Sequence, residues 1–302
     1  MTSQITTFHI FYHPQNTRAV FWAAKINGFI KKQFPELKAD PKKPDVVIVL
    51  GGDGTILEAA RKFHELGSIM FGLNLGNVGF LASVREEKDF LKALGNFLKG
   101  KFGIIERMML SAQVVRRGPD VKNIEDPRFS NRALREENRD KVVFTAEALN
   151  EIVVKNPLGM VELQAKVAGH PVQYIRGTGL LVSTATGSTA YNLSAHGPIV
   201  MPDIKCFVIT ELLDHSIPSP SMVVKYNSIV DIKVVSFKKR GIISLSKTNK
   251  KIDVLLIADG ESVFPLEEKD EITIKSSPHL VKFAELEKNY FFKSLKEKFN
   301  FK

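Results

Sequence analysis

The chain has 302 residues, and its 43 Lys plus Arg against 33 Asp plus Glu give a formal net charge of +10. A hydrophobic fraction of 44% and a charged fraction of 25% are those of an ordinary folded protein, which excludes dominant disorder and collagen-like or coiled-coil architecture. The single cysteine, Cys206, excludes an internal disulfide, and the lack of any apolar run of eighteen residues predicts a cytoplasmic protein without a transmembrane helix.

The first hundred residues alternate between strand-like and helix-like segments. In chain order, the predicted strands are 7–11, 45–50 and 69–73, and the predicted helices are 18–34, 56–66 and 86–98. The second strand reads DVVIVL, a β-branched run typical of a parallel strand buried on both faces. The alternation therefore predicts an α/β domain with an open, mostly parallel sheet.

The pattern changes after Gly103 to many short strand-like runs, which indicate a β-rich domain. Residues 285–299 return to a helical pattern. We expect an α/β domain over 1–103, a β-rich domain over 104–283, and a C-terminal segment, 284–302, that packs back on the first domain. The charged segment 116–141 is expected to be a solvated excursion between strands.

The sequence GGDGT at 51–55 interrupts the buried strand and precedes a helix. Glycines let the backbone approach a ligand closely, and the N–H groups of a helix N-terminus suit a phosphate. A carboxylate there would repel that anion, so we expect Asp53 either to hold a metal ion or to accept a proton from an attacking hydroxyl. The alternative is a tight turn with an ordinary helix-proximal Asp.

Three further segments are candidates for ligand contacts. A second glycine loop, 74–80, follows the next predicted strand, at the strand end where open α/β sheets bind ligands. Residues 184–191 read TATGSTAY and combine hydroxyls with an aromatic ring, although a capped helix N-terminus explains them equally. Asn150 and Glu151 precede a β-branched run, and Glu151 could accept hydrogen bonds from two ribose hydroxyls. The seven histidines form no metal-binding pattern.

Together these motifs resemble the NAD kinase family along nearly the whole chain. The resemblance covers GGDGT at 51–55, NLGNVGFLA at 74–82, ERMML at 106–110, ALNEIVV at 148–154, STATGSTAYNLSAHGPIV at 183–200 and ADGE at 258–261. GGDGT is shared with lipid kinases, whereas the Asn-Glu pair and the TGSTAY block are more particular to NAD kinases.

The resemblance implies an enzyme that transfers the γ-phosphate of ATP, or of polyphosphate, to the 2′-hydroxyl of the adenosine ribose of NAD. Asp53 would be the general base, and a divalent metal, expected to be Mg²⁺ held through the phosphates, would be required. No residue is expected to be a dedicated metal ligand. The family further implies a homodimer or homotetramer.

The resemblance also assigns binding residues. The phosphate loop would be Gly51, Gly52, Gly54 and Thr55. The residues expected to contact NAD are Asp53, Gly54, Phe80, Asn150, Glu151, Arg176, Thr178, Thr189, Ala190, Tyr191, Asn192, Leu193, Ser194 and Glu261.

Three positions depart from the family pattern. Thr178 stands where Asp is usual, His196 where a second glycine is usual, and Glu261 where glutamine is common. None of the three is the phosphoryl-transfer position, so we expect activity to survive with altered NAD affinity or NAD/NADH preference.

Two other functions compete with this interpretation. A lipid kinase sharing GGDGT would use the basic surplus to reach a membrane, and a non-catalytic nucleotide-binding regulator would account for the three departures. The TGSTAY block argues against the first, and the presence of Asp53, Asn150 and Glu151 against the second. The charge itself allows nucleic acid, anionic membranes, phosphate-rich ligands or solubility alone; the motifs favour phosphate-rich ligands, with no nucleic-acid or membrane partner.

Overall fold

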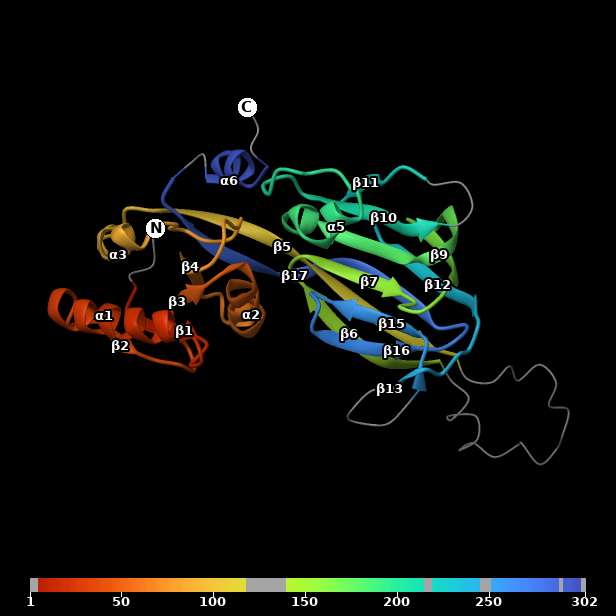
Figure 1. Cartoon of the computed structure of the whole chain (residues 1–302), viewed down its shortest axis with the longest axis horizontal. Coiled ribbons are helices and arrows are strands. Elements are labelled where there is room, and N and C mark those ends of the chain that lie inside the picture. Colours follow the sequence, from red (N-terminus) through yellow and green to blue (C-terminus); the bar gives the residue numbers. More distant parts are fainter. Residues whose placement is uncertain (1–4, 118–139, 215–218, 245–250, 288–289, 300–302) are drawn as a thin grey trace, which may run out of the picture. The chain divides into compact units, whose positions relative to one another are not determined.

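The computed structural model describes residues 5–117, 140–214, 219–244, 251–287 and 290–299 (Figure 1). The chain divides into two compact units: unit 1, Met1–Met108 with Pro278–Lys302, and unit 2, Met109–Ser277. The division falls within two long strands, β5 (Gly103–Arg116) and β17 (Glu271–Glu285), so both strands contribute residues to each unit. The expected domain boundaries at 103 and 284 stay a prediction.

Unit 1 contains the predicted alternation of strands and helices. Besides its parts of β5 and β17, its elements are β1 (Thr7–Tyr12), α1 (Thr17–Gln33), β2 (Lys38–Ala39), β3 (Val46–Gly51), α2 (Asp53–Phe63), the 3-10 turn η1 (His64–Leu66), β4 (Ile69–Asn74), the 3-10 turn η2 (Glu87–Asp89), α3 (Phe90–Leu98) and α6 (Tyr290–Phe299).

The strands of unit 1 lie in the order β17-β4-β3-β1-β2, and every neighbouring pair is parallel. The predicted open parallel sheet is therefore confirmed. Strand β3 is buried along its length, as its β-branched sequence indicates. Helices α1 and α3 share one apolar core with alternate strand residues, where Trp22 contacts Phe90 with ring centroids 4.9 Å apart. Helix α2 covers the opposite face, where Phe63 contacts His9 and Phe11.

Three helix starts differ from the sequence prediction. Helix α2 begins at Asp53 rather than Ile56, because Gly52 is its N-cap residue and the N–H of Ile56 already donates to the carbonyl of Gly52 at 3.1 Å. Helix α3 begins at Phe90 after the η2 turn. Helix α6 begins at Tyr290 rather than 285, because pairing with β4 keeps the chain extended to Glu285.

Unit 2 is almost entirely strands. Besides its parts of β5 and β17, its elements are β6 (Lys141–Ala148), β7 (Glu151–Lys155), β8 (Val161–Val167), β9 (His170–Thr184), the 3-10 turn η5 (Thr186–Thr189), α5 (Tyr191–Ser194), β10 (Cys206–Asp214), β11 (Met222–Lys225), β12 (Val230–Phe237), β13 (Ile243–Ser244), β14 (Lys251–Ile252), β15 (Val254–Ala258) and β16 (Ser262–Leu266).

The main sheet of unit 2 runs β16-β15-β7-β9-β8-β12-β17, with antiparallel neighbours throughout. Strand β9 also pairs with β10, and β5 pairs with β6. The predicted β-rich region is confirmed.

Most of the charged segment 116–141 lies outside the described residues. At its start, Arg116 forms a bidentate ion pair with the buried carboxylate of Asp270, with N–O distances of 2.8 and 2.7 Å.

The C-terminal helix returns to the first part of the chain, as expected. The Arg85 guanidinium donates to the Tyr290 carbonyl at 3.0 Å and to Ser294 Oγ at 2.6 Å. Ser294 Oγ in turn donates to the carbonyl of Gly79 at 2.9 Å, so α6 contacts the second glycine loop directly. Among the helices in the described part of the chain, none has the length and apolar character needed to cross a membrane.

Candidate functional site

The two glycine loops of unit 1 lie side by side. Strands β3 and β4 are parallel neighbours whose register pairs Gly51 with Asn74, so both loops leave the same edge of the sheet. The N–H of Leu75 donates to the carbonyl of Gly51 at 3.2 Å. The predicted adjacency of the two loops is therefore a property of the fold.

Asp53 is held by the second loop. Its carboxylate accepts hydrogen bonds from the backbone N–H of Phe80 at 2.8 Å and of Leu81 at 3.2 Å. A Cβ atom at Gly79 would collide with this carboxylate, so only glycine fits at that position. Each carboxylate oxygen accepts one of these two bonds and keeps lone pairs for a ligand.

The phosphate-loop residues leave an open backbone surface at the start of α2. A Cβ atom at Gly52 or Gly54 would meet no atom within 4 Å, whereas one at Gly51 would collide with Thr55. Gly52 has no side chain to cap the helix. The first turn of α2 also presents backbone N–H groups that have no partner within the helix, which suits an anion.

Helix α6 covers the aromatic residue of the second loop. The ring of Phe291 lies 5.8 Å from that of Phe80, and Lys298 Nζ lies 4.9 Å from the Phe80 ring centre. Burial raises the pKa of Tyr290 to about 12, with the Asp53 charge adding to the effect, so its hydroxyl stays neutral. The sequence predicts Phe80 as a binding residue and a helix that returns to this domain, but it gives no sign that the α6 side chains cover Phe80.

In unit 2, Asp259 organises the Asn150–Glu151 turn. Its buried carboxylate accepts hydrogen bonds from the N–H groups of Leu149 at 2.8 Å, Asn150 at 2.8 Å and Glu151 at 3.2 Å. Sequence reasoning missed this role. The sequence offered one indication: Asp259 and Gly260 form an Asp-Gly pair between two apolar runs, which is typical of a β-hairpin turn.

Glu151 is a buried carboxyl beside this second acid. Its Oε2 has no hydrogen-bond partner within the described part of the chain. Burial raises the pKa of Glu151 to about 8, the Asp259 carboxylate adds to the rise, and a hydrogen bond from the backbone N–H of Tyr191 opposes it. At neutral pH the carboxyl is therefore mostly protonated and can donate as well as accept a hydrogen bond.

The hydroxyl block packs against the same turn. The Asn150 carbonyl accepts from the N–H of Thr184 at 2.9 Å and from Ser183 Oγ at 3.2 Å. A Cβ atom at Gly187 would collide with that carbonyl. The structure thus brings together Asn150, Glu151 and the 183–194 segment.

Within that segment, the predicted binding residues differ in what they already contact. The Asn192 side chain donates to the carbonyls of Ser188 at 3.3 Å and Pro198 at 3.0 Å, and accepts from Thr210 at 2.8 Å, so it holds the block together. Tyr191 is 36% exposed, with Lys155 Nζ 5.2 Å from its ring centre, and is available for stacking. Thr189, Ala190, Leu193 and Ser194 belong to the same two turns, η5 and α5, or join them.

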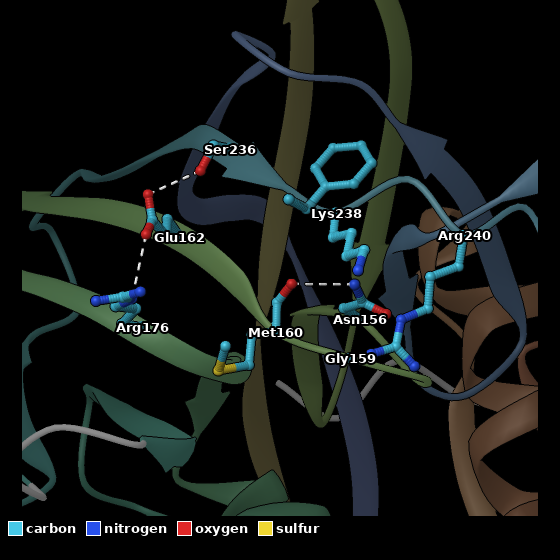
Figure 2. A pocket seen from close by; sticks show the side chains of 9 residues that line it. Asn156, Gly159, Met160, Glu162, Arg176, Ser236, Lys238 and Arg240 are labelled. Atoms are coloured by element: carbon cyan, nitrogen blue, oxygen red, sulfur yellow. Dashed lines mark hydrogen bonds and ion pairs between the residues drawn. The ribbon is translucent and has the colours of Figure 1, made fainter.

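Arg176 lies elsewhere in unit 2, in a pocket of about 460 Å³ between β8, β9 and β12 (Figure 2). Its guanidinium is 3.2 Å from the Glu162 carboxylate, and Lys238 and Arg240 line the same pocket. Thr178 lies two residues along β9, where its carbonyl accepts from the N–H of Asn156 at 2.8 Å. Glu261 is exposed in the β15–β16 turn, two residues after Asp259.

His196 adopts a left-handed backbone conformation, with φ of 61°. Glycine reaches this region without strain, which explains in physical terms why glycine is usual there. A side chain at the following residue, Gly197, is excluded because a Cβ atom would collide with Asn192.

Comparison with known proteins covers nearly the whole chain. Residues 12–102 match the ATP-NAD kinase N-terminal domain, and residues 149–286 match the ATP-NAD kinase C-terminal domain. The chain is 34% identical over 256 residues to an NAD kinase of Natranaerobius thermophilus, covering 84% of this chain and 77% of that protein. It is 31% identical over 270 residues to an NAD kinase of Lachnoclostridium phytofermentans, covering 89% and 85%.

Two solved structures share the fold. Yeast NADH kinase complexed with NADH gives a TM-score of 0.79 at 20% identity, covering 99% of this chain and 89% of that one. An NAD kinase from Archaeoglobus fulgidus in complex with ATP gives a TM-score of 0.67 at 21% identity, covering 96% and 98%.

Proposed function

The chain belongs to the NAD kinase family, and we propose that it transfers the γ-phosphate of ATP to the 2′-hydroxyl of the adenosine ribose of NAD to form NADP. The observation that carries this proposal is the placement of Asp53. One carboxylate stands at the first turn of α2, on a glycine loop suited to phosphate, and is fixed by two N–H donors of the neighbouring loop.

Asp53 acts as the general base. The 2′-hydroxyl donates its proton to a carboxylate oxygen as the hydroxyl oxygen attacks the γ-phosphorus, and ADP leaves. Positioning and charge neutralisation supply most of the rate in phosphoryl transfer, and a carboxylate held by Phe80 and Leu81 needs little reorganisation.

Unit 2 supplies the nucleoside contacts. Glu151 and Asn150 bind ribose hydroxyls, and the neutral carboxyl of Glu151 both donates to and accepts from them. Tyr191 stacks on the adenine, while Thr189, Ala190, Asn192, Leu193 and Ser194 form the surrounding turn. Arg176, Thr178 and Glu261 act on the rest of the NAD molecule, with the Arg176 charge suited to its pyrophosphate.

A divalent cation, Mg²⁺, fits this chemistry. Mg²⁺ takes oxygen ligands and is bound mainly through substrate phosphates with one or two carboxylates. We expect the substrate phosphates to hold the ion, while the lone pairs that the Asp53 carboxylate keeps serve the 2′-hydroxyl proton. When bound, the ion neutralises the phosphate charge; Asp53 still takes the proton.

The family resemblance also supports a homodimer or homotetramer, with polyphosphate as an alternative donor to ATP. The one cysteine, Cys206, is a buried free thiol, which supports a cytoplasmic location.

A substrate panel tests the proposal. The protein is incubated with Mg²⁺, with ATP or polyphosphate as donor, and with NAD, NADH or diacylglycerol as acceptor, and NADP(H) is measured by a coupled assay. We expect phosphorylation of NAD or NADH with ATP. Phosphorylation of diacylglycerol alone would establish a lipid kinase, and binding of NAD without turnover would establish a regulator.

A further inference from the structure

Two histidines that are far apart in the sequence lie together in unit 1. His64 follows α2 in the η1 turn, and His279 lies in β17. Their ring centres are 5.2 Å apart, and the ring planes meet at 69°. Glu65, the next residue of η1, joins them: one ring nitrogen of each histidine and one carboxylate oxygen all lie within 4.8 Å of one another.

The tautomer of His64 suits metal binding. Its Nδ1 lies 2.8 Å from the carbonyl oxygen of Arg61, an acceptor, so Nδ1 carries a hydrogen, and in the neutral ring the lone pair is on Nε2. Metal-binding histidines characteristically donate their second ring N–H to a carbonyl or carboxylate in this way. The ring is therefore oriented before any ion arrives.

The backbone of the cluster is fixed on both sides. The N–H of His64 donates to the carbonyl of Ala60 as the last turn of α2, and the N–H of Gly67 donates to the carbonyl of His64 at 3.0 Å. Gly67 ends the turn in a left-handed conformation, with φ of 68°. His279 lies in β17 three residues before Lys282, which pairs with Ile69 of β4.

The ligand set selects the class of ion. The donors that unit 1 contributes, two imidazoles and one carboxylate, suit zinc and its transition-metal neighbours, whereas Mg²⁺ prefers oxygen ligands alone. Zn–N bonds of about 2.0 Å place the ligands of a tetrahedral site roughly 3.3 Å apart. The ligand atoms lie at most 4.8 Å apart, so each distance must shorten by no more than about 1.5 Å to form the site. Side-chain rotation can supply this change.

We propose that His64, Glu65 and His279 bind a zinc-class transition-metal ion, with water completing the coordination. The ion would fasten the C-terminal end of α2, the helix that starts at Asp53, to β17. This site is separate from the Mg²⁺ of the proposed kinase reaction and does not depend on that activity.

Calorimetric titration of the untagged, chelator-treated protein with Zn²⁺, without nucleotide, tests the site. We expect one ion per chain, and Co²⁺ should give the visible absorption bands of a four-coordinate site. Because binding stabilises the folded state, Zn²⁺ should also raise the Tm of the wild type. The absence of stoichiometric Zn²⁺ binding, or an unchanged Tm, would overturn the proposal.

Variants identify the ligands. His64→Ala and His279→Ala should each weaken Zn²⁺ binding by tenfold or more, and Glu65→Gln should weaken it less. His13→Ala is the matched control, because His13 pairs with Glu58 at 3.0 Å, is not one of the three proposed ligands and should leave binding unchanged. Unchanged affinity in both His64→Ala and His279→Ala would overturn the assignment. If one of them fails to fold, as judged by circular dichroism, the other and Glu65→Gln still decide.

Discussion

At the scale of single residues, Glu151 shows how burial changes the chemistry of a carboxyl group. Its pKa rises from the ordinary 4.5 to about 8, so between these pH values the folded state binds more protons than the unfolded state. The free energy of unfolding should therefore fall as the pH rises through this window and level off above it.

Glu151→Gln should remove this pH dependence, because the amide cannot ionise. Relative to the wild type, the variant should gain stability from pH 5 to pH 9 by roughly 4 kcal/mol, the part of the pKa difference that falls between these pH values. Urea unfolding at several pH values measures it. Glu268→Gln, at an exposed carboxyl, is the control that keeps the wild-type profile; parallel curves for Glu151→Gln and wild type would contradict the prediction.

Thr178 tests the meaning of a departure from the family pattern. Gly177 and Gly179 on either side cannot carry a Cβ atom, because it would collide with the backbone of β10 and β7 respectively, so only position 178 can vary here. Thr178→Asp restores a charged acceptor and should lower the KM for NAD roughly fivefold, the difference between a charged and a neutral hydrogen bond. Thr178→Asn has the shape of Asp without its charge, so it should leave the KM for NAD nearly unchanged. An unchanged KM in Thr178→Asp would show that a charged acceptor at this position does not improve NAD binding.

At the scale of elements, the loop between β4 and α3 depends on close contact with α2. Gly79→Ala should push the Asp53 carboxylate away from the N–H groups of Phe80 and Leu81. We expect NADP formation to fall at least a hundredfold with the fold preserved, because a base displaced by about 1 Å loses its alignment. Gly28→Ala, on α1 where a Cβ atom meets nothing within 4 Å, is the control. Wild-type kcat in Gly79→Ala would contradict the role of this contact.

Helix α6 should support the same loop through Arg85. Its guanidinium binds Tyr290 and Ser294 and lies 2.6 Å from the Glu297 carboxylate, so Arg85→Ala removes three contacts at once. The unfolding free energy should fall by about 2 kcal/mol, and hydrogen exchange should speed up in α6 and at Phe80. Lys293→Ala, whose exposed partner is Glu287, should change neither. Protection of α6 equal to the wild type would show that Arg85 does not anchor it.

The elements also show what a sequence can predict. The β-branched run of β3 and the glycines after it identify a buried parallel strand and its loop, because both signals are local. The starts of α2 and α6 were misplaced, because a glycine N-cap and pairing with β4 decide them. Asp259 and the His64–His279 pair were missed as site residues because their partners are far away in the sequence.

At the scale of the whole molecule, the surplus of ten positive charges does not identify the function. Several basic side chains have local partners: Arg85 pairs with Glu297, Arg116 with Asp270 and Arg176 with Glu162. The remaining field can attract polyanions such as ATP and NAD, but the reaction is assigned by a few residues in two loops and one turn.

The measurement that tests the proposed role of Asp53 most directly compares wild type with Asp53→Asn in NADP formation from NAD and ATP with Mg²⁺, alongside NAD binding by calorimetry. The amide can still accept one N–H bond from the second loop but cannot take a proton. We predict that kcat falls by a factor of about 10² or more while the Kd for NAD changes little. Turnover by Asp53→Asn at the wild-type rate would contradict the assignment of Asp53 as the base.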